Sequence, residues 1–292
     1  MHITNRANLP DAIVKAVTND PYPHGRTGDI SVTRLIGPPQ IRVLERIHQD
    51  EIEGDAADRI WALVGQIGHG ILERAETVAI TEQRLFAEVE GWQVSGQFDR
   101  LALLPNGTLQ DYKITSVWSV IDNGAKPDWI AQLNVLRWLA AKNDYDINKL
   151  QVVAILRDWS KGKARQGGNY PPVQVRVLDV PVWSAIDCDA YIRDRVHLHQ
   201  LAEIQADTGR PLPECTAEER WAKPDVWAVK KPGRKSAVKL YDSQNDAGQH
   251  AREIKNGYIE HRPGESVRCA DYCAAAPFCR QWQAMQQQAE VA

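Results

Sequence analysis

The chain of 292 residues is 43% hydrophobic and carries a formal net charge of −3. A chain of this length and composition can bury a substantial core, and we expect one compact domain with an insertion. A net charge near zero argues against a protein that coats nucleic acid nonspecifically, and leaves room for a localised binding groove. The first residues lack the apolar core of a signal peptide and no transmembrane run is present, so we expect a cytoplasmic protein without membrane contact.

A helical stripe of apolar residues predicts a long helix over residues 56–76. The stripe consists of Ile60, Leu63, Val64, Ile67, Ile71 and Leu72. Gly65, Gly68 and Gly70 each weaken a helix by up to about 1 kcal/mol relative to alanine, so we expect them to mark close packing against another element. His69 lies among these glycines. Taken alone, a histidine in such a helix is more often a hydrogen-bonded core residue than a metal ligand.

The next segment predicts a meander of three strands, at residues 84–95, 97–104 and 108–115. The last two strands are joined at Pro105-Asn106-Gly107, because Asn-Gly tolerates the positive φ angles that a hairpin turn requires.

One face of the third strand carries a carboxylate and an amine. Side chains alternate along a strand, so Asp111 and Lys113 share a face, and Asp99 on the partner strand can lie beside them. An Asp and a Lys two residues apart on a solvated strand are common and need no function. Here the flanking residues are apolar enough for an interior hairpin, and an interior carboxylate pair is costly unless a cation compensates it. The pattern favours a site for a hard divalent cation and a water, which phosphodiester hydrolysis needs.

Helices and strands continue to alternate on either side of this segment. We expect helices near residues 39–48, 127–142 and 183–207, and strands at 149–157 and 172–180. Together with the meander they predict an α/β fold, a mixed central sheet flanked by helices.

Four motifs, in this order along the chain, resemble the PD-(D/E)XK nuclease superfamily and in particular its RecB-like branch. They are Trp61-Ala-Leu-Val-Gly-Gln-Ile-Gly-His69, Gly96-Gln-Phe-Asp99, Asp111-Tyr-Lys113 and Trp129-Ile-Ala-Gln132-Leu-Asn-Val-Leu136. The resemblance covers roughly residues 31–160 and implies a restriction-endonuclease-like fold.

The same resemblance implies roles for individual residues. It implies that Mg²⁺ or Mn²⁺ is bound by His69, Asp99, Asp111 and the backbone carbonyl of Tyr112. It implies that Lys113 positions or deprotonates the attacking water, and that Gln132 orients the phosphate or the shell of the metal. Leu136 stands where the family usually has tyrosine, so no role is assigned to a tyrosine hydroxyl.

The chain has five cysteines, three of them between Cys269 and Cys279. In a cytosolic protein, clustered cysteines more often bind metal than form disulfides. Four thiolates suit a structural zinc or an iron–sulfur cluster, and neither gap in the trio has the Cys-X-X-Cys spacing usual in zinc knuckles. Unliganded thiols are the remaining alternative. Cys215, in a proline-bounded loop, is preferred as the fourth ligand over Cys188, which lies in a predicted helix and suits a small buried residue.

A lone cysteine followed by a trio, here Cys215, Cys269, Cys273 and Cys279, resembles the iron–sulfur staple of the AddB nuclease domain and of related CRISPR-adaptation nucleases. The resemblance implies a [4Fe-4S] cluster, with zinc as the alternative and His250 or His261 as substitute zinc ligands. In those relatives the first cysteine usually precedes the nuclease core, whereas here no cysteine precedes Cys188.

Residues 227–241 predict a hairpin around Pro232-Gly233, followed by a short helix and a returning strand. The hairpin contains no acidic residue and five basic ones, Lys230, Lys231, Arg234, Lys235 and Lys239. A solvated turn is the plain alternative. The block of positive charge nevertheless stands against the net charge of the chain, and phosphate contact is its natural use. A second basic loop carries Lys161, Lys163 and Arg165.

These observations predict a nuclease core at residues 1–210 and a cysteine region at 211–292 with a basic insertion at about 222–262. We expect a metal-dependent DNA exonuclease that acts on single-stranded DNA or DNA ends in phage-type recombination or repair, in a bacterial host cell, with a recombinase or helicase as a candidate partner. The main alternative is a nuclease-like module that binds DNA ends without cutting, which Leu136 favours. A third interpretation has the cysteines on zinc and the nuclease motifs accidental.

Overall fold

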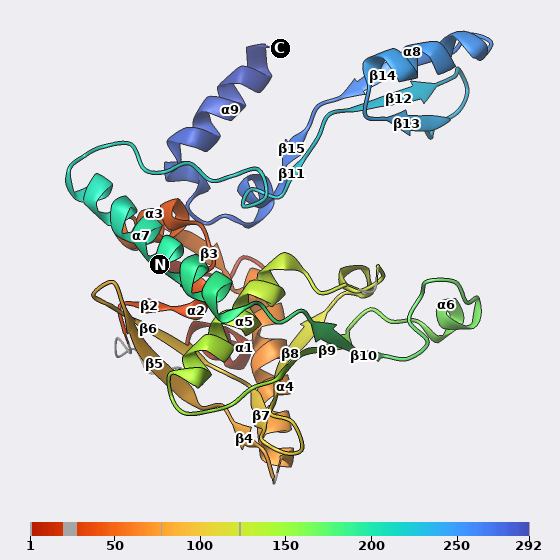
Figure 1. Ribbon diagram of the computed structural model, residues 1–292. Helices are drawn as coiled ribbons and strands as arrows, with labels where there is room; N and C mark the ends of the chain where they lie inside the picture. Colours follow the sequence, from red (N-terminus) through yellow and green to blue (C-terminus); the bar gives the residue numbers. More distant parts are fainter. Residues whose placement is uncertain (1, 20–27, 77, 123, 292) are drawn as a thin grey trace. The chain divides into compact units, whose positions relative to one another are not determined.

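The computed structural model describes residues 2–19, 28–76, 78–122 and 124–291 (Figure 1). The chain divides into two compact units. The first comprises Met1–Val43 and Gln49–Pro213, and the second Leu44–His48 and Glu214–Ala292.

The first unit is an alternation of helices, strands and short 3₁₀ turns (η). In chain order its elements are β1 (His2–Thr4), α1 (Asp11–Thr18), β2 (Ile30–Ser31), α2 (Val32–Leu35), α3 (Pro39–Ile47, whose last turn belongs to the second unit), β3 (Glu53–Asp55), η1 (Ala56–Arg59), α4 (Ile60–Ala75), β4 (Ile80–Thr81), β5 (Arg84–Val89), β6 (Trp92–Gln97), β7 (Arg100–Ala102), β8 (Thr108–Thr115), η2 (Val117–Ser119), α5 (Pro127–Ala141), β9 (Lys149–Leu156), α6 (Lys161–Arg165), β10 (Val175–Val180) and α7 (Ala185–Asp207).

Two mixed sheets form the centre of this unit. One has the strand order β10-β9-β8-β7-β4, in which β8 and β9 are parallel and the other neighbours antiparallel. The other has the order β2-β6-β5, in which β2 and β6 are parallel. Helix α5 packs against strands of both sheets and α4 lies against β8 (Figure 1). The predicted mixed α/β architecture is therefore present.

The core of the first unit lies between α5, α7 and these sheets. It includes the fully buried side chains of Leu109, Leu133, Leu139, Leu150 and Ile192. Every second residue of β9 is buried, as expected for a strand with one face toward the core.

The single strand predicted at residues 84–95 is wrong, because the structure has two strands there. β5 and β6 form an antiparallel hairpin whose turn residues, Glu90 and Gly91, have φ angles of 47° and 76°. Two consecutive positive φ angles are typical of a type I′ turn, which Asn-Gly, Asp-Gly and Gly-Gly favour. Glu-Gly predicts such a turn less strongly than these pairs do, so the sequence predicts one long strand here.

His199 on α7 is completely buried and links that helix to the end of α2 and to α3. Its Nε2 lies 3.1 Å from the Leu35 carbonyl oxygen, and its Nδ1 accepts a hydrogen bond of 3.0 Å from Arg42 Nε. Burial, together with the positive charges of Arg42 and Arg195, lowers the pKa of His199 to about 4. The imidazole is therefore neutral at neutral pH and donates through Nε2 to Leu35.

We expect this histidine to make the protein sensitive to acid. Its pKa is about 4 in the folded chain against an ordinary value of 6.5. The unfolded chain therefore binds more protons between these pH values, and about 3 kcal/mol of the free energy of unfolding is lost as pH falls through the window. Urea unfolding at about pH 7 and about pH 4 measures the loss. His199→Gln should reduce the pH dependence, whereas the same change at the exposed His197 of α7 should leave it intact. Equal pH dependence in wild type and His199→Gln would contradict this account.

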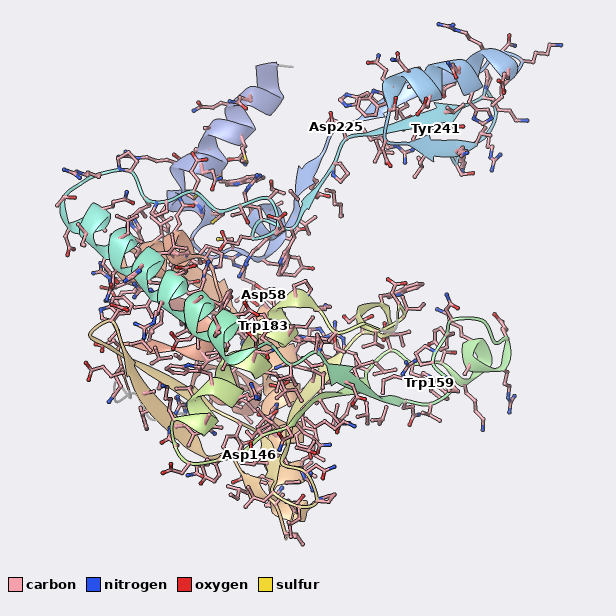
Figure 2. The ribbon with its side chains drawn as sticks, viewed as in Figure 1. Asp58, Asp146, Trp159, Trp183, Asp225 and Tyr241 are labelled. Atoms are coloured by element: carbon pink, nitrogen blue, oxygen red, sulfur yellow. The ribbon has the colours of Figure 1, made fainter. Side chains whose placement is uncertain are left out.

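The second unit contains short strands, two helices and irregular turns. Its elements are β11 (Ala222–Lys223), β12 (Val226–Lys230), β13 (Lys239–Tyr241), α8 (Gln244–Glu253), β14 (Tyr258–Arg262), β15 (Glu265–Ser266), a π-helix η3 (Arg268–Tyr272), a 3₁₀ turn η4 (Ala276–Phe278) and α9 (Arg280–Val291). β12 pairs antiparallel with β13 and β14, and α8 covers this sheet around Val229, Ala247 and Ala251 (Figure 2, in which Tyr241 is labelled). The predicted hairpin, helix and returning strand are thus confirmed.

No helix within the described ranges combines the length and the apolar character that crossing a membrane would require.

Candidate active site

The hairpin of β7 and β8 brings the two predicted aspartates together. Arg100 pairs with Gln110, so Asp99 comes opposite Asp111, one step further along the antiparallel register. The peptide N–H of Tyr112 donates a hydrogen bond of 2.6 Å to Asp99 Oδ2. In the turn, Gly107 has a φ of 57°, as the sequence predicts for this position.

The site opens where the two sheets separate. β6 ends at Gln97 in one sheet, and β7 begins at Arg100 in the other. The pairing of β7 with β8 stops at Gln110, whereas β9 accompanies β8 on its other edge as far as Thr115. From Asp111 onward, the edge of β8 that β7 has left is no longer paired with β7. At this edge the Tyr112 N–H donates to the Asp99 side chain and not to a neighbouring strand.

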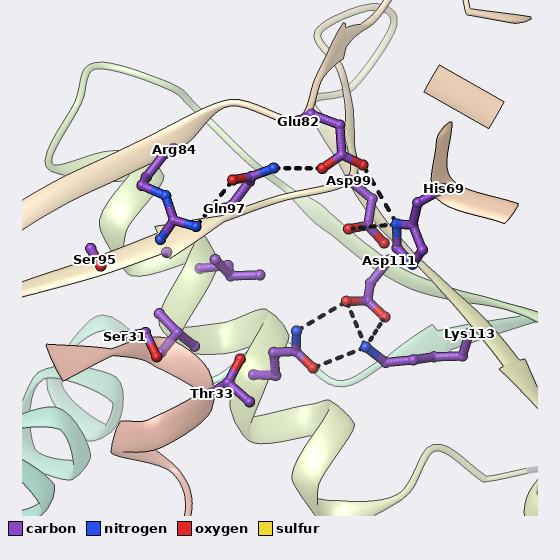
Figure 3. A pocket seen from close by; sticks show the side chains of 14 residues that line it. Ser31, Thr33, His69, Glu82, Arg84, Ser95, Gln97, Asp99, Asp111 and Lys113 are labelled. Atoms are coloured by element: carbon purple, nitrogen blue, oxygen red, sulfur yellow. Dashed lines mark hydrogen bonds and ion pairs between the residues drawn. The ribbon is translucent and has the colours of Figure 1, made fainter. Parts of the chain in front are cut away.

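Asp111 and Lys113, which share one face of β8 (Figure 3), form a closed group with Gln132 of α5. Lys113 Nζ donates hydrogen bonds of 3.0 Å to Asp111 Oδ1 and 3.1 Å to Gln132 Oε1, and Gln132 Nε2 donates 3.1 Å to Asp111 Oδ1. Lys113 Nζ also lies 2.7 Å from Asp111 Oδ2 as an ion pair. That oxygen is buried and, apart from this ion pair, has no hydrogen-bond partner among the described residues. A carboxylate oxygen has two lone pairs, so Asp111 Oδ2 can accept one further ligand beside the Lys113 ammonium.

His69 joins the site from α4, together with a residue that the sequence analysis missed, Glu82. His69 Nδ1 lies 3.5 Å from Glu82 Oε1 and 3.5 Å from Asp99 Oδ1. Gln97 Nε2 donates a hydrogen bond of 2.6 Å to Glu82 Oε2, and Arg84 holds Gln97 in turn (Figure 3). Ligand atoms of His69, Glu82 and Asp99 all lie within 4.8 Å of one another. Glu82 precedes β5 in a connection without a motif, so only the fold reveals it.

Two glycines permit the close packing around this site. A Cβ on Gly68 would lie 2.6 Å from Ile114 Cδ1, so α4 approaches β8 closely at this point. A Cβ on Gly96 would lie 2.6 Å from Leu136 Cδ2, so α5 approaches β6 closely at this point. The predicted close packing is wrong for Gly65 and Gly70. Among the described residues, apart from the chain neighbours and the backbone of α4, no atom lies within 4 Å of a Cβ built on either.

Several carboxylates lie close together in this site, and their mutual repulsion and burial shift the pKa values of its residues. Burial, and then the negative charge of Asp111, raise the pKa of Asp99 to about 7. The hydrogen bond with Glu82 raises the pKa of His69, although burial opposes it, and the charge of Asp99 raises it further. Burial raises the pKa of Glu82, but hydrogen bonds from His69 and Gln97 outweigh it and the net shift is downward. A bound cation would relieve this excess of negative charge.

The donor set suits a divalent cation that takes oxygen and nitrogen ligands. Two carboxylates and an imidazole within 4.8 Å of one another match the spacing of ligands around one ion, and carboxylates favour Mg²⁺ or Mn²⁺. The site lines a pocket of about 310 Å³, which Lys113 and Gln132 also reach. The residues present therefore fit the predicted metal.

We expect Asp99→Asn to stabilise the metal-free protein. The folded pKa of Asp99, about 7, exceeds its ordinary value of 3.8, so stability is fully present below about pH 4 and is lost as pH rises through 7. Asparagine keeps an acceptor for the Tyr112 N–H and should raise the free energy of unfolding in EDTA by roughly 2–4 kcal/mol at about pH 8. Thermal melts in EDTA at about pH 5 and about pH 8 measure it, with the exposed Asp146→Asn as control. A gain of equal size at both pH values would contradict the electrostatic cause. Mn²⁺ should stabilise wild type more than Asp99→Asn.

Four cysteines share one environment in the second unit. Cys269 lies in the π-helix, Cys273 follows it and Cys279 directly precedes α9. Burial raises the pKa of the Cys215 thiol to about 12, and the charges of Glu219 and of the other three thiols contribute to the rise. All three therefore lie within electrostatic reach of Cys215.

Gln281 of α9 fixes the Cys215 loop. Its side chain accepts a hydrogen bond of 2.9 Å from the Cys215 N–H and donates one of 2.9 Å to the Cys215 carbonyl. Cys188 is separate, since it is buried in the core of the first unit and donates to the Asn134 carbonyl at 3.4 Å. Among these five described cysteines none forms a disulfide.

The five basic residues of the hairpin are not equivalent. Lys230 forms an ion pair of 2.7 Å with Glu260 on β14, and only 17% of its side chain is exposed. Lys239 lies over the Tyr241 ring at 4.8 Å. The remaining three are exposed in the connection between β12 and β13; they are Lys231, Arg234 and Lys235.

No protein-family model matches this chain, and no curated protein does. Among solved structures it is similar to SSO0001, with a TM-score of 0.45 and 16% identity over 64% of this chain and 84% of that one. It is also similar to an alkaline exonuclease, LHK-Exo, from Laribacter hongkongensis, with a TM-score of 0.32 and 13% identity over 49% of this chain and 66% of that one. For LHK-Exo in complex with dAMP the TM-score is 0.32 and the identity 14%, over 61% of this chain and 96% of that one.

Proposed function

We propose that the protein is a metal-dependent DNA nuclease, an exonuclease with a restriction-endonuclease-like core. The observation that carries the proposal is the convergence of Asp99, Asp111 and Lys113 with His69 and Glu82 in one pocket. The sequence motifs support the same chemistry, because they resemble those of the RecB-like nucleases. From that resemblance we also predict a role in phage-type recombination or repair and a recombinase or helicase partner.

His69, Glu82 and Asp99 would hold the cation, and the buried Asp111 Oδ2, which pairs with Lys113, can accept a further ligand and join them. The N–H and C=O of one residue leave the same edge of a strand, so the Tyr112 carbonyl is directed to the side on which its N–H meets Asp99. This supports the prediction that the Tyr112 carbonyl is a further ligand. Bound Mg²⁺ or Mn²⁺ would supply Lewis-acid stabilisation of phosphate charge and lower the pKa of a water.

Lys113 and Gln132 would position the attacking water and the phosphate. The Lys113 amine is held between Asp111 and Gln132 and lines the pocket, so it can donate to a phosphate oxygen or hold a water in line with the phosphorus. Gln132 fixes Asp111 and Lys113 through one amide, which keeps both side chains in one geometry.

For the second unit we propose a [4Fe-4S] cluster on Cys215, Cys269, Cys273 and Cys279. The charges of the other three thiols act on Cys215, so the four cysteines share one neighbourhood of this unit. Four thiolates that share one neighbourhood match the Cys₄ ligation of such clusters. Zinc is the alternative.

The basic hairpin would contact DNA phosphates. Lys231, Arg234 and Lys235 are exposed on one turn, and Lys239 lies nearby on β13. Lys230 was predicted with them, but its pairing with Glu260 reduces the charge that it can offer.

A digest of end-labelled DNA tests the proposal. The purified full chain is incubated with single-stranded, linear duplex and circular duplex DNA in Mn²⁺, in Mg²⁺ and in EDTA. Loss of linear and single-stranded DNA only with metal supports an exonuclease. Cleavage of the circle indicates an endonuclease. DNA binding without cleavage under any of these conditions favours the alternative of an inactive end-binding module, which the aliphatic Leu136 in the family's tyrosine position supports.

A further inference from the structure

An exposed tryptophan on α4 carries an arginine on one face. The guanidinium carbon of Arg157 lies 4.1 Å from the centre of the Trp61 ring, and Trp61 is still 56% exposed. Trp92, Trp129 and Trp159, in contrast, pack against the core of this unit. None of the residues of α4 is buried, so the Trp61 ring is not part of a core that the helix needs. The arginine leaves much of the indole surface in water.

A second exposed indole is held on a rigid turn. Trp118 in η2 is 69% exposed, whereas its neighbours Val117 and Val120 are buried. The Asp158 carboxylate accepts hydrogen bonds of 2.7 Å from the Val117 N–H and 2.7 Å from Ser116 Oγ. The turn is thus tied to the residue next to Arg157, while the Trp118 ring itself is left in solvent.

Positive charge continues along the connection that follows β9. This connection passes Trp159, labelled in Figure 2, and leads to α6. Lys161, Lys163 and Arg165 are exposed there, and Lys163 Nζ lies 6.0 Å from the Tyr170 ring centre. Interleaved cations and aromatic rings are the surface that unpaired nucleic-acid strands bind, since phosphates meet the charges and bases stack on the rings.

This surface lies beyond the pocket along the same elements. Trp61 is eight residues before His69 on α4, a rise of about 12 Å. The Arg157 N–H donates a hydrogen bond of 2.9 Å to the carbonyl of Thr115, which is two residues, about 7 Å, beyond Lys113 on β8. A strand whose phosphate reaches Lys113 would therefore pass Arg157 and Trp61 within a few nucleotides.

We propose that the Trp61–Arg157 pair is a stacking site for an unpaired base of a DNA strand, and that Trp118 and the 161–165 segment extend it. The inference rests on the proposed nuclease function for its choice of ligand. It assigns the preference for single-stranded DNA or DNA ends to named residues, because a duplex keeps its bases stacked on each other and cannot use the site. The site thus selects single strands or frayed ends.

Binding to oligo(dT) and to an abasic oligonucleotide of equal length tests the proposal. Fluorescence anisotropy in EDTA measures affinity without cleavage. Both strands carry the same phosphates, so the ratio of their affinities reports base stacking. Trp61→Ala should weaken oligo(dT) binding by roughly 5- to 150-fold, the equivalent of ~1–3 kcal/mol per stacked base, and leave abasic binding nearly unchanged. Trp61→Phe should restore most of the loss. The exposed Phe86→Ala on β5 is the matched control and should behave as wild type.

Several outcomes would overturn the proposal. They are an unchanged affinity of Trp61→Ala for oligo(dT), an equal loss for both oligonucleotides, and a wild type that does not prefer bases to the abasic strand. Hydrolysis of a small phosphodiester, bis(p-nitrophenyl) phosphate, with Mn²⁺ reports the pocket alone. If that hydrolysis is absent but the base preference depends on Trp61, the nuclease proposal fails and the stacking site stands. If hydrolysis is present in wild type and in Trp61→Ala with no base preference in either, the stacking site fails alone.

Discussion

Asp111→Asn and Lys113→Met should each reduce Mn²⁺-dependent DNA cleavage by roughly 10²–10³-fold or more, the cost of removing a group that acts on transition-state charge. Asp111 is buried and lines the pocket, so its replacement removes a negative charge that would help to hold the cation. Lys113 Nζ lies 2.7 Å from Asp111 Oδ2. Single-turnover digestion of labelled DNA measures the loss.

Stability must be separated from catalysis in this experiment. Removing one partner of a buried ion pair costs roughly 3–5 kcal/mol, whereas replacing both by neutral groups of similar shape is often neutral. The double variant Asp111→Asn/Lys113→Met should therefore melt near wild type and still be inactive. Lys149→Met is the matched control, since Lys149 forms an exposed pair of 3.1 Å with Asp179 on neighbouring strands. Full activity in Asp111→Asn or in Lys113→Met would remove these residues from the mechanism.

The sequence predicts the part of this site that depends on local spacing. Asp111 and Lys113 share a face because side chains alternate along β8, and Asp99 lies opposite because a hairpin fixes the register. Gln132 was identified by its motif alone, and the structure places its amide between the other two side chains.

Glu82 could not be predicted in this way. It lies between β4 and β5, where its φ angle is 49° and its N–H donates a hydrogen bond of 3.2 Å to the Asp99 carbonyl, at the point where the two sheets separate. No local pattern marks that separation, and the unrecognised Glu90-Gly91 turn had merged β5 with β6. The pair Trp61–Arg157 could not be predicted either. The two residues are 96 positions apart in the sequence, and only the fold places the arginine over the ring.

Replacing Cys273 by serine should remove any bound metal and unfold the region around α9. In zinc-finger peptides the binding free energy of a structural metal, about 10–16 kcal/mol, contributes to folding. We therefore expect the loss of one ligand in four to destabilise the segments that the four cysteines connect. Near Cys273 the chain consists of a π-helix of five residues and a 3₁₀ turn of three, both too short to be stable alone. Iron, sulfide and zinc analysis of an anaerobic preparation, with its visible spectrum and a thermal melt, measures both effects. Four irons and a brown colour support the cluster, and one zinc in a colourless protein supports the alternative.

The two cysteines outside the C-terminal trio, Cys215 and Cys188, make the test specific. Cys215 neighbours the other three thiols and Cys188 is packed beside Asn134 in the first unit, so Cys215→Ser should repeat the loss seen in Cys273→Ser. Cys188→Ser should keep the metal content of wild type and lose only the small amount of stability that a polar atom costs in a core. Equal metal content in wild type and Cys215→Ser would exclude Cys215 as the fourth ligand. If the wild type contains no metal and has the same melting temperature as Cys273→Ser, the four thiols bind no ligand. Their proximity is then a feature of packing.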